Sequence, residues 1–268
     1  MRRIHLFEWE DQPWLPTVFR DFITDHLRYT QNEAMRRPIN LEIAERLKAV
    51  LQRVGTRRLV DLCAGAGGPL VNIRAILADE LECPVEIVLT DLYPNVAAFR
   101  RLEAESEGAI QGRYESTSAL DVPAELHGVR TLFTALHHFP PEQVRSILAD
   151  AVRKREAVAV FEPLERTGRM VTLMAVATFV RGLTHTPIVG RLTLQRFLFT
   201  YVCPVAPAIF AWDGAVSALR SYTAEELLAL ARSATNAGYE WEAGTFDVRG
   251  PYGRMPTTYL IGSPNTKN

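Results

Sequence analysis

The residues with the clearest chemical potential form a glycine-rich turn after a short apolar run. The run Leu59-Val60 leads into Asp61, and the turn continues as Leu62, Cys63, Ala64, Gly65, Ala66, Gly67, Gly68 and Pro69. Glycines here permit a tight turn and let a ligand approach the backbone closely. Proline at position 69 suits the first turn of a helix. The segment therefore predicts a strand, a ligand-binding turn and a helix.

Three details of this turn limit the class of ligand. Phosphate-binding loops of the Walker type end in Gly-Lys and Ser or Thr, a sequence that this turn lacks. The dinucleotide-binding pattern would need a glycine where Leu70 stands. Asp61, four residues before Gly65, would repel a pyrophosphate. The turn is better suited to a ligand that carries positive charge.

Two further acids follow expected strands. Asp91 ends the run Ile87-Val88-Leu89-Thr90, and a carboxylate there can accept hydrogen bonds from both hydroxyls of a ribose. The alternative is an aspartate that caps a helix or lies on the surface. Asp121 follows the third expected strand, where it can accept a hydrogen bond from an adenine amine while Leu120 or Val122 packs against the ring. It can also cap the short segment that follows.

Alternating strands and helices must position these acids. Short apolar or β-branched runs predict strands at 58–63, 85–90, 113–117, 130–135 and 157–162. Helical patterns lie between them at 69–81, 96–105 and 141–154. This alternation predicts an α/β fold with a parallel sheet that is covered on both faces.

Helical segments flank the alternating region. Apolar spacing predicts a helix at 16–29 and, after Pro38, a second helix that Asn40 would cap. Thr223 and Glu226 have the spacing of a capping box, and closing antiparallel strands are expected at 239–248 and 257–261. The predicted organisation is an N-terminal helical cover (1–56), a ligand-binding core (57–162), a helical insertion with a helix at 170–183 (163–220), the completion of the sheet (221–262) and a tail (263–268).

Composition excludes several classes of protein. The 268 residues are 47 % hydrophobic with a net charge of −1, which gives no electrostatic basis for binding nucleic acid. Three cysteines are too few and too far apart for a zinc cluster, so no metal site is expected. The first ten residues lack the apolar core of a signal peptide, and a cytoplasmic location is expected.

The segment 197–212 is apolar and uncharged, but it is shorter than a membrane span and contains Pro204 and Pro207. It predicts a buried or lid-forming helix pair rather than a membrane span. Peripheral association with a membrane stays open.

The order of these motifs resembles the class I S-adenosylmethionine-dependent methyltransferases. The resemblance rests on Asp61 with its glycine turn, the two later acids, and the sequence Thr134-Ala135-Leu136-His137-His138-Phe139-Pro140 after the fourth strand. It covers residues 55–165 by motif and 220–262 by topology alone. It implies a doubly wound, mostly parallel seven-stranded sheet with the last strand antiparallel, and S-adenosyl-L-methionine as cofactor.

The resemblance also assigns roles to residues at the strand ends. The methionine part would lie at Asp61, Cys63, Ala64, Gly65 and Gly67, the ribose at Asp91 and Leu92, the adenine at Asp121 and Val122, and the sulfonium beside Ala135 and Leu136. N-terminal helices and an insertion after strand five usually cover the substrate in this family.

Methyl transfer requires a general base when the acceptor is a phenol or an alcohol. His137 and His138 are candidates because they follow strand four, although paired histidines here also occur in family members with unrelated substrates, which favours a structural role. Glu162, at the end of strand five, is a comparable candidate.

The leading hypothesis is methylation of a small molecule, such as a secondary metabolite, on oxygen or nitrogen in an enclosed pocket. Trp9, Trp14, Phe19 and Tyr29 would give the N-terminal cover an aromatic lining, or would simply pack in the core. Alternatives are a peptide or protein carboxylate methyltransferase with an open groove, and a protein that binds S-adenosylmethionine without catalysis. The insertion could line the pocket or pair with the second subunit of a homodimer.

Overall fold

The computed structural model describes residues 1–31, 33, 36–234, 238–250 and 253–265. The chain forms two compact units, each built from two separate segments. Unit 1 comprises Met1–Gln31 and Leu164–Tyr222, and unit 2 comprises Asn32–Pro163 and Thr223–Asn268. Residues 1–56, which the sequence groups as one cover, are therefore divided between the two units.

The described part of unit 2 contains a seven-stranded sheet in the order β3-β2-β1-β4-β5-β7-β6. Its strands are β1 (Arg58–Asp61), β2 (Glu86–Leu89), β3 (Ile110–Gly112), β4 (Val129–Phe133), β5 (Val158–Glu162), β6 (Tyr239–Gly250) and β7 (Gly253–Pro264). The first five are parallel, and β7 runs antiparallel to both β5 and β6. This arrangement confirms the predicted fold class.

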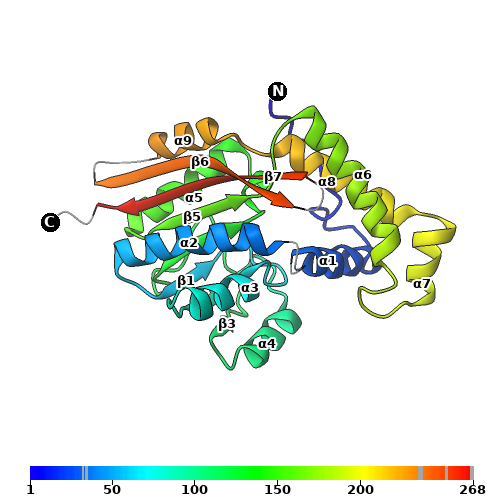
Figure 1. Ribbon diagram of the computed structural model, residues 1–268, viewed down its shortest axis with the longest axis horizontal. Helices are drawn as coiled ribbons and strands as arrows, with labels where there is room; N and C mark the ends of the chain where they lie inside the picture. The colour runs from blue at the N-terminus through cyan, green and yellow to red at the C-terminus, as the bar shows by residue number, and fades with distance from the viewer. Residues whose placement is uncertain (32, 34–35, 235–237, 251–252, 266–268) are drawn as a thin grey trace. The chain divides into compact units, whose positions relative to one another are not determined.

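Helices of unit 2 cover the sheet. They are α2 (Arg37–Val54), α3 (Leu70–Ala75) with the continuing turn η2 (Ile76–Glu80), α4 (Val96–Glu105), the short η3 (Leu136–His138), α5 (Pro141–Lys154) and α9 (Ala224–Ser233). In Figure 1, α2 crosses in front of the strands beside α3, while α5 packs against α9. One buried cluster joins α2, α3 and α4 to the sheet through Leu47, Leu70, Phe99 and Phe161. The core thus fixes the strand ends from which the site is built.

Two local predictions are wrong. The third strand, predicted at 113–117, lies at Ile110–Gly112, where Gly112 sits against the ring of Phe99 with no room for a side chain. Asn40 does not cap α2, because the helix already begins at Arg37 with Pro38 in its first turn. Asn40 is instead buried within the helix. By contrast, the capping box of Thr223 and Glu226 at the start of α9 is confirmed.

Unit 1 is helical. It contains α1 (Thr17–Gln31), α6 (Gly168–His185), α7 (Leu194–Phe197), the turn η4 (Leu198–Val202) and α8 (Val205–Arg220). Helices α6 and α8 approach closely through glycines, since a Cβ on Gly214 would lie 2.9 Å from the side chain of Thr178. The N-terminal segment is tied to α8, because the Trp9 amide donates to Asp213 Oδ1 (2.7 Å) and Arg220 Nη1 lies 3.3 Å from Glu8 Oε1.

Among the described residues, no single helix is long and apolar enough to cross a bilayer. One bent pair, Leu194–Val202 with Val205–Arg220, meets the length and composition criteria together, with an angle of 69° between its two parts.

Candidate functional site

Unit 2 gathers the predicted acids at one edge of its sheet. Asp61 ends β1, Asp91 follows β2 by two residues, and Glu162 ends β5. These strands are parallel, so their carboxyl ends share one edge. In the strand order, β1 lies between β2 and β4. Strands β2 and β3 lie on one side of β1, and the chain then returns to place β4 and β5 on its other side. Ligands of open α/β sheets bind outside the strand ends at such a switch point.

The glycine turn is held between β1 and β2. The Ala64 amide donates to the Thr90 carbonyl (2.9 Å), and the Gly67 amide donates to the Ala64 carbonyl (2.7 Å). Gly65 (φ 54°) and Gly67 (φ 100°) both have left-handed backbone conformations. An added Cβ on Gly65 would meet open space, whereas on Gly67 it would collide with Leu102 at 2.3 Å. Packing against Leu102 therefore requires glycine at position 67, and Gly65 leaves the backbone open to a ligand.

Cys63 also has a left-handed backbone (φ 59°), which is uncommon for a residue with a side chain. Burial raises the pKa of its thiol, and the nearby Asp91 and Asp61 carboxylates raise it further. Both effects disfavour the thiolate, which is the nucleophilic form of cysteine. The strained backbone at this position is typical of a binding turn.

Asp61 is a buried carboxyl that accepts one side-chain hydrogen bond. Thr131 on β4 donates its hydroxyl to Asp61 Oδ1 (2.6 Å). Burial raises the Asp61 pKa to about 8, and Asp91 adds to this rise, while the Thr131 hydrogen bond acts in the opposite direction. Among the described residues, no cation acts on this carboxyl. A cationic ligand group would restore its charge.

Asp91 is fixed by two backbone amides. Gly65 N donates to its Oδ2 (2.9 Å) and Tyr93 N to its Oδ1 (2.8 Å). Each carboxylate oxygen can accept a further hydrogen bond, so both remain able to bind ligand hydroxyls. Its neighbour Leu92 is exposed. The structure thus brings Asp61, Gly65 and Asp91 together across the β1 and β2 ends.

Asp121 has a different environment. Its carboxylate is exposed and accepts a hydrogen bond from Lys154 Nζ (2.8 Å) at the end of α5. The following residue, Val122, is buried, and its amide donates to Asp150 Oδ2 (3.3 Å). An adenine amine would have to compete with Lys154 for this carboxylate.

The segment after β4 is organised by Glu162. Glu162 Oε1 accepts from the amides of Ala135 (3.0 Å) and Leu136 (2.7 Å), and Oε2 lies 2.7 Å from His137 Nδ1. Glu162 and His137 are buried, whereas His138 is half-buried with its ring centroid 4.3 Å from that of His137. Thr134, just before this segment, has a left-handed backbone (φ 53°). Glu162 therefore acts on the loop rather than facing solvent.

Sequence reasoning missed Thr131. In the sequence it is one β-branched residue that follows Arg130 in a short strand, and nothing in its spacing distinguishes it. Its role follows from the pairing of β1 with β4, which places Thr131 beside Asp61. A polar residue in an otherwise buried strand was the only signal available.

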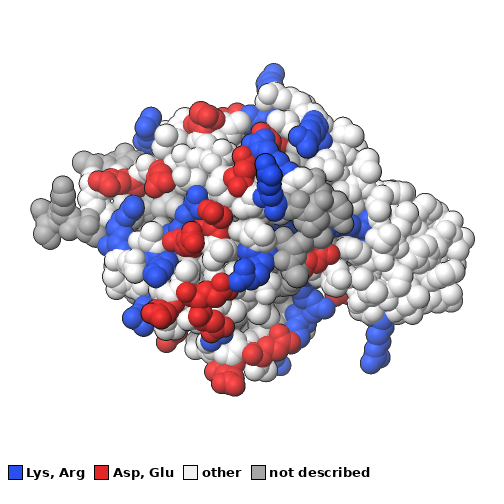
Figure 2. All heavy atoms as spheres, in the orientation of Figure 1, with Lys and Arg blue, Asp and Glu red and all other residues white. Residues whose placement is uncertain are grey.

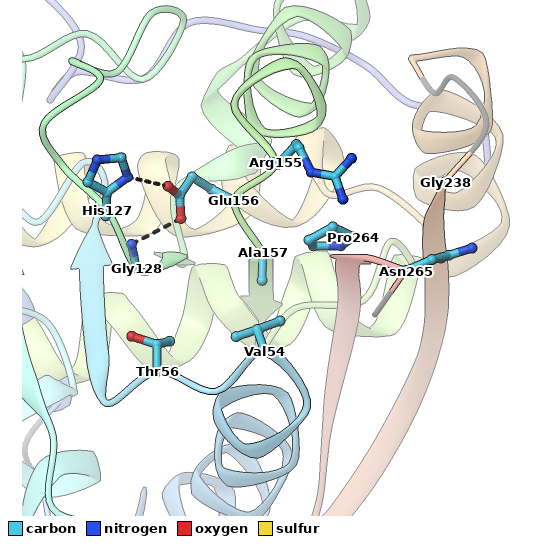
Figure 3. Close-up of a pocket in the computed structure, with 10 residues that line it drawn as sticks. All are labelled: Val54, Thr56, His127, Gly128, Arg155, Glu156, Ala157, Gly238, Pro264 and Asn265. Carbon is cyan, nitrogen blue, oxygen red and sulfur yellow. Dashed lines mark hydrogen bonds and ion pairs between the residues drawn. The ribbon is translucent and has the colours of Figure 1, made fainter. Parts of the chain in front are cut away.

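A cavity of about 600 Å³ lies elsewhere in unit 2 (Figure 3). Its wall includes His127 and Gly128 before β4 and Glu156 before β5, at the amino ends of the strands. Figure 3 shows Glu156 accepting from the Gly128 amide (3.0 Å) and paired with His127 (2.7 Å). None of the predicted site residues lines it.

Unit 1 has its own apolar pocket of about 440 Å³. The pocket collects aromatic side chains from the N-terminal segment, α1 and α8, namely Phe7, Trp9, Trp14, Phe19 and Trp212. Tyr29, the remaining aromatic residue predicted to line the cover, instead packs edge-on against His185 (5.2 Å between centroids).

No family model matches the chain, and no curated protein matches it. Among solved structures it is similar to the CMeT domain of citrinin polyketide synthase, with 13 % identity and a TM-score of 0.51 over 95 % of this chain and 59 % of that one. It is also similar to the methyltransferase domain of bacterial CtHen1, with 15 % identity and a TM-score of 0.49 over 84 % of this chain and 98 % of that one.

A third similar structure is NcsB1, an O-methyltransferase from neocarzinostatin biosynthesis in complex with S-adenosylmethionine and 2-hydroxy-5-methyl naphthoic acid. It shares 16 % identity and a TM-score of 0.46, over 84 % of this chain and 56 % of that one. The strand order and the similarity to the CMeT domain show that this chain has the fold of the class I S-adenosylmethionine-dependent methyltransferases.

Proposed function

We propose that the chain is an S-adenosylmethionine-dependent methyltransferase that acts on oxygen or nitrogen of a small molecule. The observation that carries the proposal is the pair of carboxylates at the ends of β1 and β2, one buried without a cation and one fixed beside the open Gly65 backbone. S-adenosylmethionine carries an ammonium group and a ribose diol, which match these two carboxylates.

In this proposal, Asp61 attracts the ammonium group of the methionine part, and the backbone from Cys63 to Gly67 lies against it. Asp91 accepts hydrogen bonds from the ribose hydroxyls beside Leu92. The loop of Asp121 and Val122 contacts the adenine, and Ala135 and Leu136 lie beside the sulfonium. The bound cofactor supplies the methyl group, and the products are the methylated acceptor, S-adenosylhomocysteine and a proton.

The proton requires an acceptor when the substrate is a hydroxyl. His138 is the better candidate, because it is more exposed than His137. His137 and Glu162 then act as positioning residues, since Glu162 fixes both the imidazole and the amides of Ala135 and Leu136. Catalysis otherwise needs only alignment of the nucleophile with the methyl group.

The aromatic pocket of unit 1 supports a flat apolar acceptor. Its volume of about 440 Å³ falls within the range of small-molecule sites, and indole and phenyl rings favour planar ligands. The CMeT domain, whose fold is similar, is part of citrinin polyketide synthase, so this fold also occurs in an enzyme that builds a small molecule.

Calorimetry with S-adenosylhomocysteine tests the cofactor site. Asp91→Ala should weaken binding by about 1–3 kcal/mol, because two charge-assisted hydrogen bonds are lost. Asp247→Ala is the matched control, since this exposed β6 carboxylate pairs only locally with Arg254 at 2.7 Å. No binding by the unmodified protein would refute the cofactor, while equal affinities of both variants would remove Asp91 from the site.

Transfer of a labelled methyl group to a panel of aromatic phenols and amines tests the acceptor.

A further inference from the structure

Unit 1 presents an apolar tip to solvent. The tip consists of the exposed large apolar side chains of α7, of η4 and of the loop before α7. They are Ile188, Leu192, Leu194, Phe197, Leu198, Tyr201 and Val202. Leu194 is 74 % exposed, Val202 65 % and Ile188 60 %. Exposed apolar patches of this kind mark binding surfaces on soluble domains.

Polar contacts beneath the apolar tip fix its backbone. Arg196 is buried beneath it, where Nη1 donates to the Val189 carbonyl (2.6 Å), the guanidinium pairs with Asp25, and its carbon lies 4.7 Å from the Phe22 ring centroid. Thr193 caps α7 by accepting from the Arg196 amide (3.2 Å), and the Tyr201 hydroxyl donates to the Leu183 carbonyl (2.7 Å). The Arg196 guanidinium and the Tyr201 hydroxyl are therefore bound within unit 1, while the large apolar side chains of the tip are exposed.

The chain segment that contains the tip carries charge of one sign. Residues 166–212 contain five arginines and no aspartate or glutamate, although the whole chain has a net charge of −1. Of these arginines, Arg169 and Arg191 are exposed. On the face shown in Figure 2, the surface over α7 is white, and one blue side chain projects from its lower edge. The tip is thus apolar and carries one exposed cation, Arg191, since Arg169 lies at the start of α6 and Arg196 is buried and paired with Asp25.

We propose that the apolar tip inserts into the interface of an anionic lipid bilayer. Aliphatic and aromatic side chains with flanking arginines are the composition of interfacial membrane-binding segments, in which hydrocarbon enters the acyl boundary and cations meet anionic headgroups. A second copy of the chain fits less well, because a symmetric contact at the tip would bring Arg191 of both copies close together, and residues 166–212 contain no acid to neutralise them.

The tip lies on the membrane rather than crossing it. The bent pair that could span by length includes α8, in which Asp213 and Arg220 are buried among the side chains of unit 1. A span would move both charged groups into hydrocarbon, which is costly. Insertion of residues 188–202 alone leaves α8 in place. The proposal is independent of methyl transfer, although an apolar acceptor would itself partition into the same interface.

Co-sedimentation with vesicles tests the proposal on the full chain. The protein should bind vesicles of phosphatidylcholine with phosphatidylglycerol, and bind less to pure phosphatidylcholine or at high salt. Leu194→Gln with Phe197→Gln should lower the partition coefficient about tenfold or more, because two inserted side chains are lost. Val71→Gln, on an exposed aliphatic residue of α3, is the matched control and should bind as the unmodified protein does.

Circular dichroism of each variant confirms that these surface changes leave the fold intact. The proposal is overturned if the unmodified protein does not sediment with anionic vesicles, or if the double variant sediments equally well. Equal binding to neutral vesicles refutes the anionic headgroup. Light scattering supplies the remaining test. If the unmodified protein is a dimer that does not bind vesicles, and the double variant is a monomer, the tip is a self-association face instead. None of these readouts depends on the cofactor or on methyl transfer.

Discussion

Asp61→Asn should stabilise the ligand-free protein at neutral and alkaline pH. The Asp61 carboxyl has a pKa of about 8 in the folded chain and 3.8 in the unfolded chain, chiefly because of burial. The unfolded chain therefore releases this proton first as the pH rises. Folding stability is lost between about pH 4 and pH 8 at about 1.4 kcal/mol per pH unit. Asparagine is neutral throughout, so it avoids this loss.

The expected difference in free energy of unfolding follows from this shift. Near pH 4 the variant and the unmodified protein should be about equally stable. At pH 7 the shift amounts to about three units, and the variant should be more stable by about 4 kcal/mol. The asparagine carbonyl can still accept the Thr131 hydrogen bond, so the native contact is kept. Urea denaturation followed by circular dichroism at several pH values measures the difference.

Ligand binding should show the opposite order. S-adenosylhomocysteine at about one hundred times its Kd should stabilise the unmodified protein by about 2.7 kcal/mol, and the variant by much less. Thr131→Val is the control, because it removes the hydrogen bond that lowers the Asp61 pKa and should extend the loss of stability to higher pH. A stability difference that does not change between pH 4 and pH 8, or a less stable variant at pH 8, would refute the reasoning.

Two further predictions concern unit 1. Burial lowers the His26 pKa from 6.5 to about 4, and the His26 ring stacks on Phe210 with 4.7 Å between centroids. As the pH falls, the imidazole therefore binds a proton in the unfolded chain before it does in the folded chain. Folding stability is lost between about pH 6.5 and pH 4 for this reason. His26→Phe should therefore reduce the acid sensitivity by about 3 kcal/mol, measured by urea denaturation at pH 7 and pH 4; unchanged acid sensitivity would contradict the assignment. Gly214→Ala should destabilise the protein by about 1–3 kcal/mol, because the added methyl meets Thr178, whereas Gly168→Ala meets no atom within 4 Å and should be neutral or stabilising by up to about 1 kcal/mol. Equal melting temperatures for these two variants would show that α6 and α8 can separate to accommodate the methyl.

Elements with local signals are predictable from the sequence. Helix α4 begins where Asn95 accepts a hydrogen bond from the Ala98 amide, and α5 begins at Pro141, so both start signals lie in neighbouring residues. The third strand is misplaced by its sequence pattern because it is only three residues long, and its position depends on pairing with β2 and on the contact of Gly112 with Phe99. Such contacts between residues distant in sequence leave no local pattern.

The candidate site divides in the same way. The acids at the strand ends could be found from the sequence, because a strand followed by an acid and a turn is a local pattern. The partners of those acids could not. Thr131 lies seventy residues from Asp61, and Lys154 lies thirty-three residues from Asp121, so both contacts exist only once the sheet and α5 have formed.

The division of each unit into two chain segments has a consequence for synthesis on the ribosome. Residues 1–31 emerge about two hundred residues before their partners on α8, as the hydrogen bond from Trp9 to Asp213 illustrates. The sheet of unit 2 likewise waits for β6 and β7, which follow β5 by more than seventy residues. Neither unit can complete its core early. Contacts of such long sequence separation slow folding and leave apolar helices exposed during translation. We expect the nascent chain to depend on chaperones until α8 has emerged for unit 1 and β7 has emerged for unit 2.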